Sequence, residues 1–194
     1  MELIPFLIYV SICSFTPGPN TCMAMSFAAT QGLGRALWFC LGVFFGILAV
    51  MACCALFSSF LASRLEQAGM IMRFLGTAYM VWLAWAIWRS SGVKQGQVEK
   101  GGQLVLNGAI LQFLNVKLIF YGITLFGTFV LPYYQGNFPA LSVIIVVLAL
   151  FGLASTTLWS LGGAALSRLF CSHPKLINSI LAILLLFCVV SLWM

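Results

Sequence analysis

The sequence predicts an all-α membrane protein with six transmembrane helices, and three observations lead to this prediction. Of the 194 residues, 63% are hydrophobic and only 6% are charged, whereas a soluble domain carries about 25% charged residues. The apolar residues gather in six runs, each close to the roughly 20 residues that cross a bilayer. The basic residues stand mostly at the ends of these runs, as topology signals do. We therefore expect a single transmembrane domain over 1–194.

The charges and cysteines exclude several other classes. The net charge is +6, with nine basic residues and three acidic ones, all Glu. The basic residues form no stripe, so we expect no nucleic-acid partner. The seven cysteines form no C-x-x-C pair, and no His/Cys cluster has metal spacing, so we expect no metal and no cofactor. We interpret the cysteines as small hydrophobic residues, with a redox role as the alternative.

The apolar runs give the expected helices in order. They cover 3–28, 36–61, 70–89, 107–131, 139–165 and 176–194. The longest connection, 90–106, is rich in Ser, Gly, Gln and Lys, which is typical of a flexible linker. Pro132 is expected to end the fourth helix, and Pro174 to open the sixth. The linker divides the chain into half-repeats of about 1–89 and 107–194.

The distribution of basic residues predicts the orientation in the membrane. The loops after the first, third and fifth helices carry six basic residues, and the loop after the second carries two. Loops with more basic residues usually lie in the cytoplasm. The linker 90–106 would therefore be cytoplasmic and both termini periplasmic. With three helices each, the halves would insert in opposite orientations. They would then form two inverted three-helix repeats, a common transporter plan.

The first predicted helix is interrupted near mid-span by Thr16-Pro17-Gly18-Pro19-Asn20. Its two prolines remove two backbone donors, and its glycine loosens the chain. In lipid, the freed carbonyls must find partners or line a wet cavity. We expect this break to line a substrate site, with a packing kink as the alternative. The candidate substrate-binding residues here are Thr16, Pro17, Gly18, Pro19 and Asn20.

The fourth predicted helix carries a second polar cluster of Gln112, Asn115 and Lys117. Lys117 lies about 15 Å deep at 1.5 Å per residue, and a buried ammonium costs about 2.5 kcal/mol or more. It should face a cavity, an anion or carbonyls, unless the span begins later and Lys117 is an interface anchor. In an unbroken helix, Asn115 and Lys117 would point about 200° apart. Whether this helix is broken stays open from sequence.

Weaker candidates lie on neighbouring helices. Tyr121 would share a helix face with Lys117, and Tyr79 in the third helix could face the same cavity. The hydroxyl residues of the fifth helix either bond their own backbone or line a path; they are Ser155, Thr156, Thr157 and Ser160. Interruptions at corresponding places in two halves, as in the first and fourth helices here, indicate a transport site.

These motifs resemble the lysine and homoserine/threonine exporter family, LysE/RhtB, over essentially the whole chain. The resemblance rests on the Thr16-Pro17-Gly18-Pro19-Asn20 run, Gly34-Arg35-Ala36, Gly76-x-Ala78-Tyr79 with Trp85, and Asn115-x-Lys117. Many members have Asn-Pro-Lys in the fourth helix, and here Val116 replaces the proline. The segment from Gln112 to Thr124 is most similar to members that export cysteine and O-acetylserine. The resemblance implies an exporter of small neutral amino acids in the bacterial inner membrane, and not an enzyme.

An amino acid crosses as a zwitterion, so the site must serve both charges. Lys117 or the half-helix N-terminus after Pro19 can receive the carboxylate. Asn20, Asn115, Thr16 and freed carbonyls can receive the ammonium. The two halves would rock around this site to alternate access. The resemblance implies a proton-driven secondary transporter, yet no carboxylate or His is predicted within a span, so energy coupling stays open.

The sequence leaves alternatives open for the substrate and for the function. One alternative is an exporter of homoserine, threonine or lysine. Another is a transmembrane thiol–disulfide electron carrier, which requires two cysteines paired within the membrane. A third is a structural membrane subunit, which predicts no cavity at Lys117. Six short helices with glycine-rich faces favour a homodimer.

Overall fold

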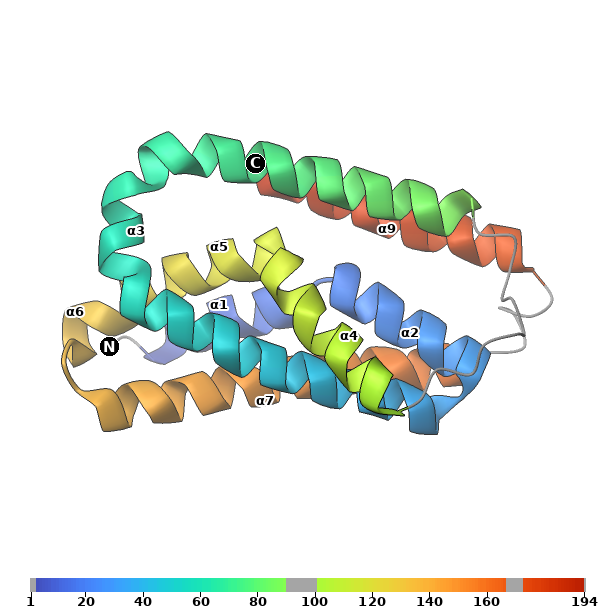
Figure 1. Ribbon diagram of the computed structural model, residues 1–194, viewed down its shortest axis with the longest axis horizontal. Helices are drawn as coiled ribbons and strands as arrows, with labels where there is room; N and C mark the ends of the chain where they lie inside the picture. The colour runs from blue at the N-terminus through green and yellow to red at the C-terminus, as the bar shows by residue number, and fades with distance from the viewer. Residues whose placement is uncertain (1–2, 90–100, 167–172, 194) are drawn as a thin grey trace.

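The computed structural model describes residues 3–89, 101–166 and 173–193, which are almost entirely helical and contain no strand (Figure 1). The side chains of 57–73 and of a few further positions on two helices lie outside the described part. The helical elements are α1 (Leu3–Phe15), α2 (Pro19–Gln31), α3 (Leu33–Arg89), α4 (Gly101–Leu114), α5 (Val116–Leu125), the π-helix η1 (Phe126–Val130), α6 (Leu131–Tyr134), α7 (Phe138–Ala165) and α9 (Pro174–Trp193). The predicted all-α class is confirmed.

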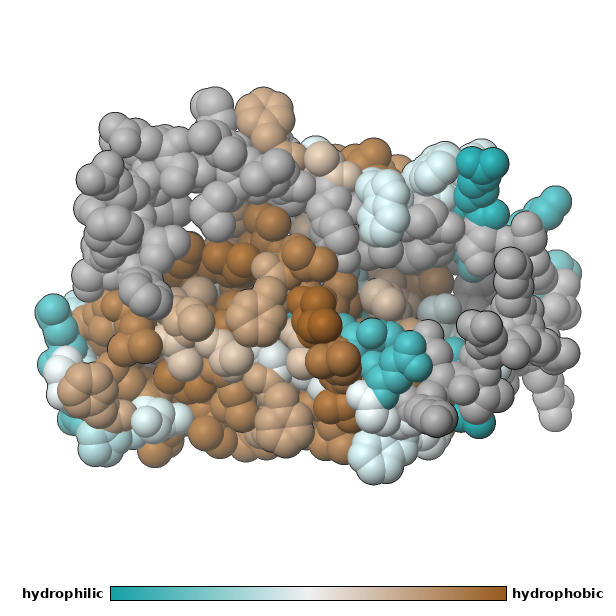
Figure 2. Space-filling view, in the orientation of Figure 1, coloured by the Kyte–Doolittle hydropathy of each residue, from teal (hydrophilic) through white to brown (hydrophobic). Residues whose placement is uncertain are grey.

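Several helices have the length and composition of membrane spans. Within the described residues, Leu33–Leu56, Val116–Tyr134 and Phe138–Ala165 are long and apolar enough to cross a bilayer, and Leu3–Phe15 and Gly101–Leu114 are shorter apolar helices. Figure 2 shows hydrophobic residues over the middle of one face, with hydrophilic residues gathered toward its two ends. A soluble monomer rarely exposes so large an apolar surface. The chain is therefore an all-α membrane protein.

Helix α3 differs from the prediction of two separate helices over 36–61 and 70–89. It is uninterrupted from Leu33 to Arg89, but its direction reverses, so that its two halves run in opposite directions (Figure 1). The residues between the two predicted helices include Ala, Arg, Leu, Glu and Gln, which are good helix formers, and no proline. Backbone hydrogen bonding therefore continues through the turn.

The first and fourth predicted helices each consist of two pieces. The predicted 3–28 helix is α1 and α2, separated at the proline-rich run as expected. The predicted 107–131 helix begins earlier, at Gly101 inside the predicted linker, and is divided between α4 and α5 at Asn115. The expectation that Pro132 ends this helix is wrong, because Pro132 lies inside α6. The π-helix before it widens the helical turns, which helps to accommodate a ring that an α-helix excludes.

Small residues let the helices around the centre pack closely. A Cβ added to Gly42 on α3 would overlap the carbonyl of Val105 on α4, and one added to Gly108 would overlap that of Phe39. The main core lies among α1, the first half of α3, α4, α5, η1 and α7 and includes Phe39, Leu104 and Phe126. A smaller cluster joins α2 to α9 and the second half of α3.

Candidate functional site

The two broken helices meet at their breaks near the centre of the molecule (Figure 1). One break separates α1, which ends at Phe15, from α2, which begins at Pro19. The other separates α4, which ends at Leu114, from α5, which begins at Val116. Each break offers the unpaired carbonyls of one helix end and the unpaired amides of the next. The region therefore has hydrogen-bonding capacity without requiring many polar side chains.

The first break is stabilised by local hydrogen bonds. The amide of Gly18, the N-cap of α2, donates to the Thr21 hydroxyl at 2.8 Å, and that hydroxyl donates back to the Gly18 carbonyl at 3.0 Å. The Thr16 hydroxyl donates to the carbonyl of Ile12 within α1. Pro19 occupies the first position of α2, where its missing N–H has no cost.

The second break is made by an N-cap rather than by proline. The Asn115 side-chain oxygen accepts a hydrogen bond from the Leu118 amide at 3.3 Å, which starts α5. Asn is among the preferred N-cap residues, so the break forms although Val116 stands where many family members have proline. Because the helix is broken, Asn115 and Lys117 line the same cavity instead of pointing apart.

Two contacts cross from one broken helix to the other. The Lys117 ammonium on α5 donates to the Thr16 carbonyl beyond the end of α1 at 3.0 Å. The amides of Asn20 on α2 and Gln112 on α4 exchange two hydrogen bonds of 2.7 and 3.0 Å. In each case the second helix of one pair reaches the end of the first helix of the other pair. The breaks are thereby held together.

Helix α7 supplies a further wall. The Ser155 hydroxyl donates to the carbonyl of Ser14 near the end of α1 at 2.7 Å. The neighbouring Thr156 hydroxyl bonds the Gly152 carbonyl of its own helix at 2.8 Å. Ser155 thus joins α7 to the first break, while Thr156 satisfies its own backbone. Both residues line the cavity described below, and of the two hydroxyls only that of Thr156 bonds its own helix.

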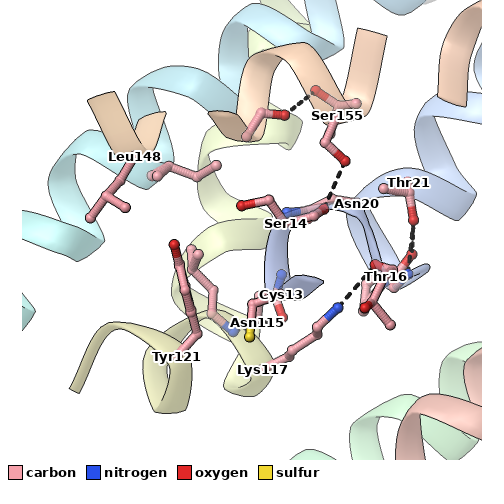
Figure 3. A pocket seen from close by; sticks show the side chains of 16 residues that line it. Cys13, Ser14, Thr16, Asn20, Thr21, Asn115, Lys117, Tyr121, Leu148 and Ser155 are labelled. Atoms are coloured by element: carbon pink, nitrogen blue, oxygen red, sulfur yellow. Dashed lines mark hydrogen bonds between the residues drawn. The ribbon is translucent and has the colours of Figure 1, made fainter. Parts of the chain in front are cut away.

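These elements enclose a small cavity (Figure 3). It contains about 60 Å³ that the centre of a water molecule can reach, and by that measure one water needs roughly 10–15 Å³. The cavity thus suits several waters or one small organic molecule. Its lining comprises Cys13, Ser14, Thr16, Gly18, Pro19, Asn20, Thr21, Ile47, Asn115, Lys117, Leu118, Tyr121, Leu148, Gly152, Ser155 and Thr156.

The cavity has a positive electrostatic character. Among the described residues, Lys117 is the one charged side chain in its lining, and no carboxylate lines it. The N-termini of α2 and α5 both border it and add partial positive charge. Carbonyl oxygens at the end of α1 supply the opposite polarity. The cavity can therefore accept an anionic group and a hydrogen-bond donor in the same small volume.

Most of the residues predicted from sequence line this cavity. They are Thr16, Gly18, Pro19, Asn20, Asn115, Lys117 and Tyr121. Pro17 is not in the lining, and Gln112 is fully buried behind it, where it holds Asn20 and bonds the Gly108 carbonyl at 2.8 Å. The side chain of Tyr79 lies outside the described residues.

The sequence analysis did not predict the apolar residues that line the cavity or the lining residues near the end of α1. Ile47 on α3 and Leu148 on α7 line the cavity, but each lies within a long apolar run that gives no local signal. Cys13 and Ser14 precede the proline-rich run by only a few residues. Their position beside a broken helix end was the one signal that could have found them.

An all-α membrane protein with a small polar cavity between two broken helices has the arrangement of a small-molecule transporter. The comparison with family models gives the same class: the LysE type translocator model matches residues 11–194. The chain therefore belongs to the LysE type translocator family, and it is a transporter rather than an enzyme.

Similar proteins are known from enteric bacteria. The chain is 39% identical to a cysteine/O-acetylserine efflux protein of Escherichia coli O157:H7, over 98% of this chain and 97% of the relative. It is 38% identical, with the same coverage, to proteins of that name from Escherichia coli K12 and Shigella flexneri serotype 5b. No solved structure matches the chain. Because it has several apolar helices and belongs to this family, the chain is a multi-pass protein of the bacterial inner membrane.

Proposed function

We propose that this protein exports small neutral amino acids, cysteine and O-acetylserine foremost, across the inner membrane by alternating access. The names of the relatives support the substrates. The observation that carries the proposal is the contact between Lys117 and the Thr16 carbonyl inside the cavity. It brings a cation and a hydrogen-bond acceptor together at the meeting point of the two breaks, which is what a zwitterion requires.

The carboxylate of the substrate is assigned to Lys117 and to the N-terminus of α2. The amides of Asn20 and Thr21 fall in the first turn of α2, where a helix offers them no acceptor of its own. Anions bind well at such positions because the amides and the helix dipole act together. A carboxylate drawn to this end neutralises the charge of Lys117 within the cavity.

The ammonium of the substrate is assigned to the carbonyl of Thr16 and the side-chain oxygens near it. In the structure the Lys117 ammonium donates a hydrogen bond to that carbonyl. A bound substrate would supply both a carboxylate for Lys117 and an ammonium for the carbonyl, so the contact between them is exchanged for two new ones. This exchange couples substrate binding to the separation of α1 and α5.

The six spans are assigned to α1 with α2, the two halves of α3, α4 with α5 through α6, α7, and α9. The connection between α2 and α3, the end of α3 and the starts of α4 and α9 lie toward one end of the molecule, opposite α6 and the N-terminus (Figure 1). That end also carries Arg35, Arg89 and Lys175, which supports a cytoplasmic location. In this proposal both termini are periplasmic and residues 90–106 are cytoplasmic.

An inverted repeat relating residues 1–89 to 107–194 is part of the proposal, within one domain over 1–194. Asn20 and Lys117 each stand two positions after an N-cap, at Gly18 and Asn115. Each donates to the end region of the other pair's first helix. Matching positions that make matching cross-contacts support the repeat. Reporter fusions at both termini and within 90–106 test the topology, and a cytoplasmic terminus would contradict it.

The decisive test of function is export from cells. Cells that over-produce the protein should survive toxic cysteine levels better than control cells and release more cysteine and O-acetylserine into the medium. No excess of either compound, with the protein present in the membrane, would refute the substrate assignment and favour homoserine, threonine or lysine. Efflux from vesicles should also fall when an uncoupler removes the pH gradient, whereas unchanged efflux would indicate a facilitator.

A thiol–disulfide electron carrier and a structural membrane subunit have less support. No disulfide joins the described cysteines, Cys13, Cys22, Cys40, Cys53 and Cys54, and family membership favours transport over electron transfer. A structural subunit does not explain a cavity at Lys117. A homodimer stays a prediction, based on the small six-helix bundle and its glycine-rich helix faces. Cross-linking in native membranes would test it.

A further inference from the structure

One polar group of the cavity lacks the hydrogen bond that buried groups usually have. The Tyr121 side chain is 9% exposed, and its enclosed hydroxyl has no hydrogen-bond partner in the structure. Among the enclosed side-chain N and O atoms of the described residues, only Gln31 Oε1 shares this property. Ser14 is a polar neighbour of the hydroxyl, without the geometry of a hydrogen bond. Most buried polar groups are paired, so this hydroxyl has capacity for a ligand.

The Tyr121 hydroxyl lies at the other end of the cavity from the Lys117 ammonium. Tyr121 stands one helical turn after Lys117 on α5, and Figure 3 shows its hydroxyl on the side of Leu148, away from the Lys117 ammonium. The ring packs against that of Tyr9, with centroids 5.6 Å apart. The ring is therefore held in place, and the hydroxyl has a fixed position relative to Lys117.

From this arrangement we infer that Tyr121 recognises the side chain of the substrate and determines the preference for a short polar one. The inference rests on the proposed function. With the carboxylate and ammonium placed between Lys117 and Thr16, the side chain must extend into the rest of the small cavity. Ile47, Leu118 and Leu148 form apolar walls there. Tyr121 then offers the polar contact at that end.

A phenol hydroxyl suits two side chains that differ in hydrogen-bonding character. A thiol is a weak donor and acceptor, whereas the ester group of O-acetylserine can only accept. Because a tyrosine hydroxyl rotates, it can donate to the ester and either donate to the thiol or accept from it. An ammonium at the same place could only donate. This property explains how one small cavity could serve both substrates and discriminate against a side chain that is only apolar.

The test compares cysteine with 2-aminobutyrate, which carries a methyl group in place of the thiol. Counterflow of each compound is measured in proteoliposomes containing the wild type, Tyr121→Phe or the matched control Tyr9→Phe, whose hydroxyl is not in the cavity lining. Loss of one neutral hydrogen bond should lower the preference for cysteine about three- to tenfold in Tyr121→Phe. The preference should be unchanged in Tyr9→Phe. KM for cysteine should rise, and KM for 2-aminobutyrate should not.

Two results would overturn the inference while leaving the proposed function intact. One is an active Tyr121→Phe variant that keeps the wild-type preference. The other needs no variant and applies even if Tyr121→Phe fails to insert: a wild-type protein that transports both compounds equally well does not use a polar contact. A wild type that transports neither cysteine nor O-acetylserine would instead refute the proposed function.

Discussion

The two breaks reach the same geometry through different chemistry. At the first break, Pro17 and Pro19 flank Gly18, and the backbone cannot continue as a helix. At the second break no proline is present, and Asn115 ends one helix and caps the next with its side chain. The proline-rich break follows from the covalent structure of proline, which prevents regular helix hydrogen bonding. The asparagine break depends on one hydrogen bond and on packing. The second break should therefore be the easier one to alter.

The largest expected effect is at the group that joins the two breaks. Lys117→Ala removes the charged side chain of the cavity and should lower export of cysteine about 10- to 100-fold, as expected for loss of a charge-assisted hydrogen bond. The measurement is amino acid released into the medium per amount of protein in the membrane. Lys175→Ala, on the exposed start of α9, is the matched control and should export normally. Normal export by Lys117→Ala would remove Lys117 from the site.

The asparagine break can be tested by changing its cap. Asn115→Ala should lower stability by about 1 kcal/mol and reduce export roughly tenfold, because a more continuous helix turns Lys117 away from the cavity. Asn115→Ser keeps a capping oxygen and should lose much less. Thermal unfolding in detergent and export assays give the two quantities. Equal export by the alanine and serine variants would show that the cap does not maintain the break.

A converse substitution makes the second break resemble the first. Val116→Pro places a proline at the first position of α5, which tolerates it, and should leave export within about twofold of the wild type. It should also restore part of the export lost in Asn115→Ala, since proline disfavours a helical conformation in the residue before it. An inactive Val116→Pro protein at normal levels would mean that Val116 has a role beyond starting α5.

The amide pair between the breaks should contribute to stability. Asn20→Ala leaves the buried Gln112 side-chain oxygen without the Asn20 donor, while the Gln112 amide nitrogen keeps its bond to the Gly108 carbonyl. The substitution should cost about 1–3 kcal/mol. Ser142→Ala removes an exposed hydroxyl that bonds its own helix and should change the unfolding temperature little. If both variants unfold alike, the amide pair adds nothing to holding the breaks together.

Among the substitutions that remove a hydrogen bond between helices of the site, the smallest effect is expected on α7. Ser155→Ala removes the 2.7 Å hydrogen bond to the Ser14 carbonyl and should cost about 0.5–1.5 kcal/mol, with a few-fold loss of export. Thr156→Val removes a bond within α7 itself and is the control. A larger export defect in Thr156→Val than in Ser155→Ala would reverse the roles given to these two residues.

The sequence by itself determined the helical membrane class, the first break and the placement of Lys117 at a cavity. These follow from local properties: apolar composition over the length of a span, proline in a helix, and a charge too deep to reach water easily. The same local reasoning separated α3 into two helices and ended a helix at Pro132. Both were wrong because helical hydrogen bonding can continue through a bend or a π-helix.

Only the tertiary structure decided where the second break lies and what surrounds the cavity. Asn20 and Gln112 are 92 residues apart in sequence, and Ile47 and Leu148 lie in ordinary apolar runs. Whether such residues meet depends on the packing of whole helices, for which close contacts at Gly42 and Gly108 are required. Asn115 could cap a helix or continue one, and neighbouring helices select between these states. A short-range signal exists for the first break, while the second is a property of the fold.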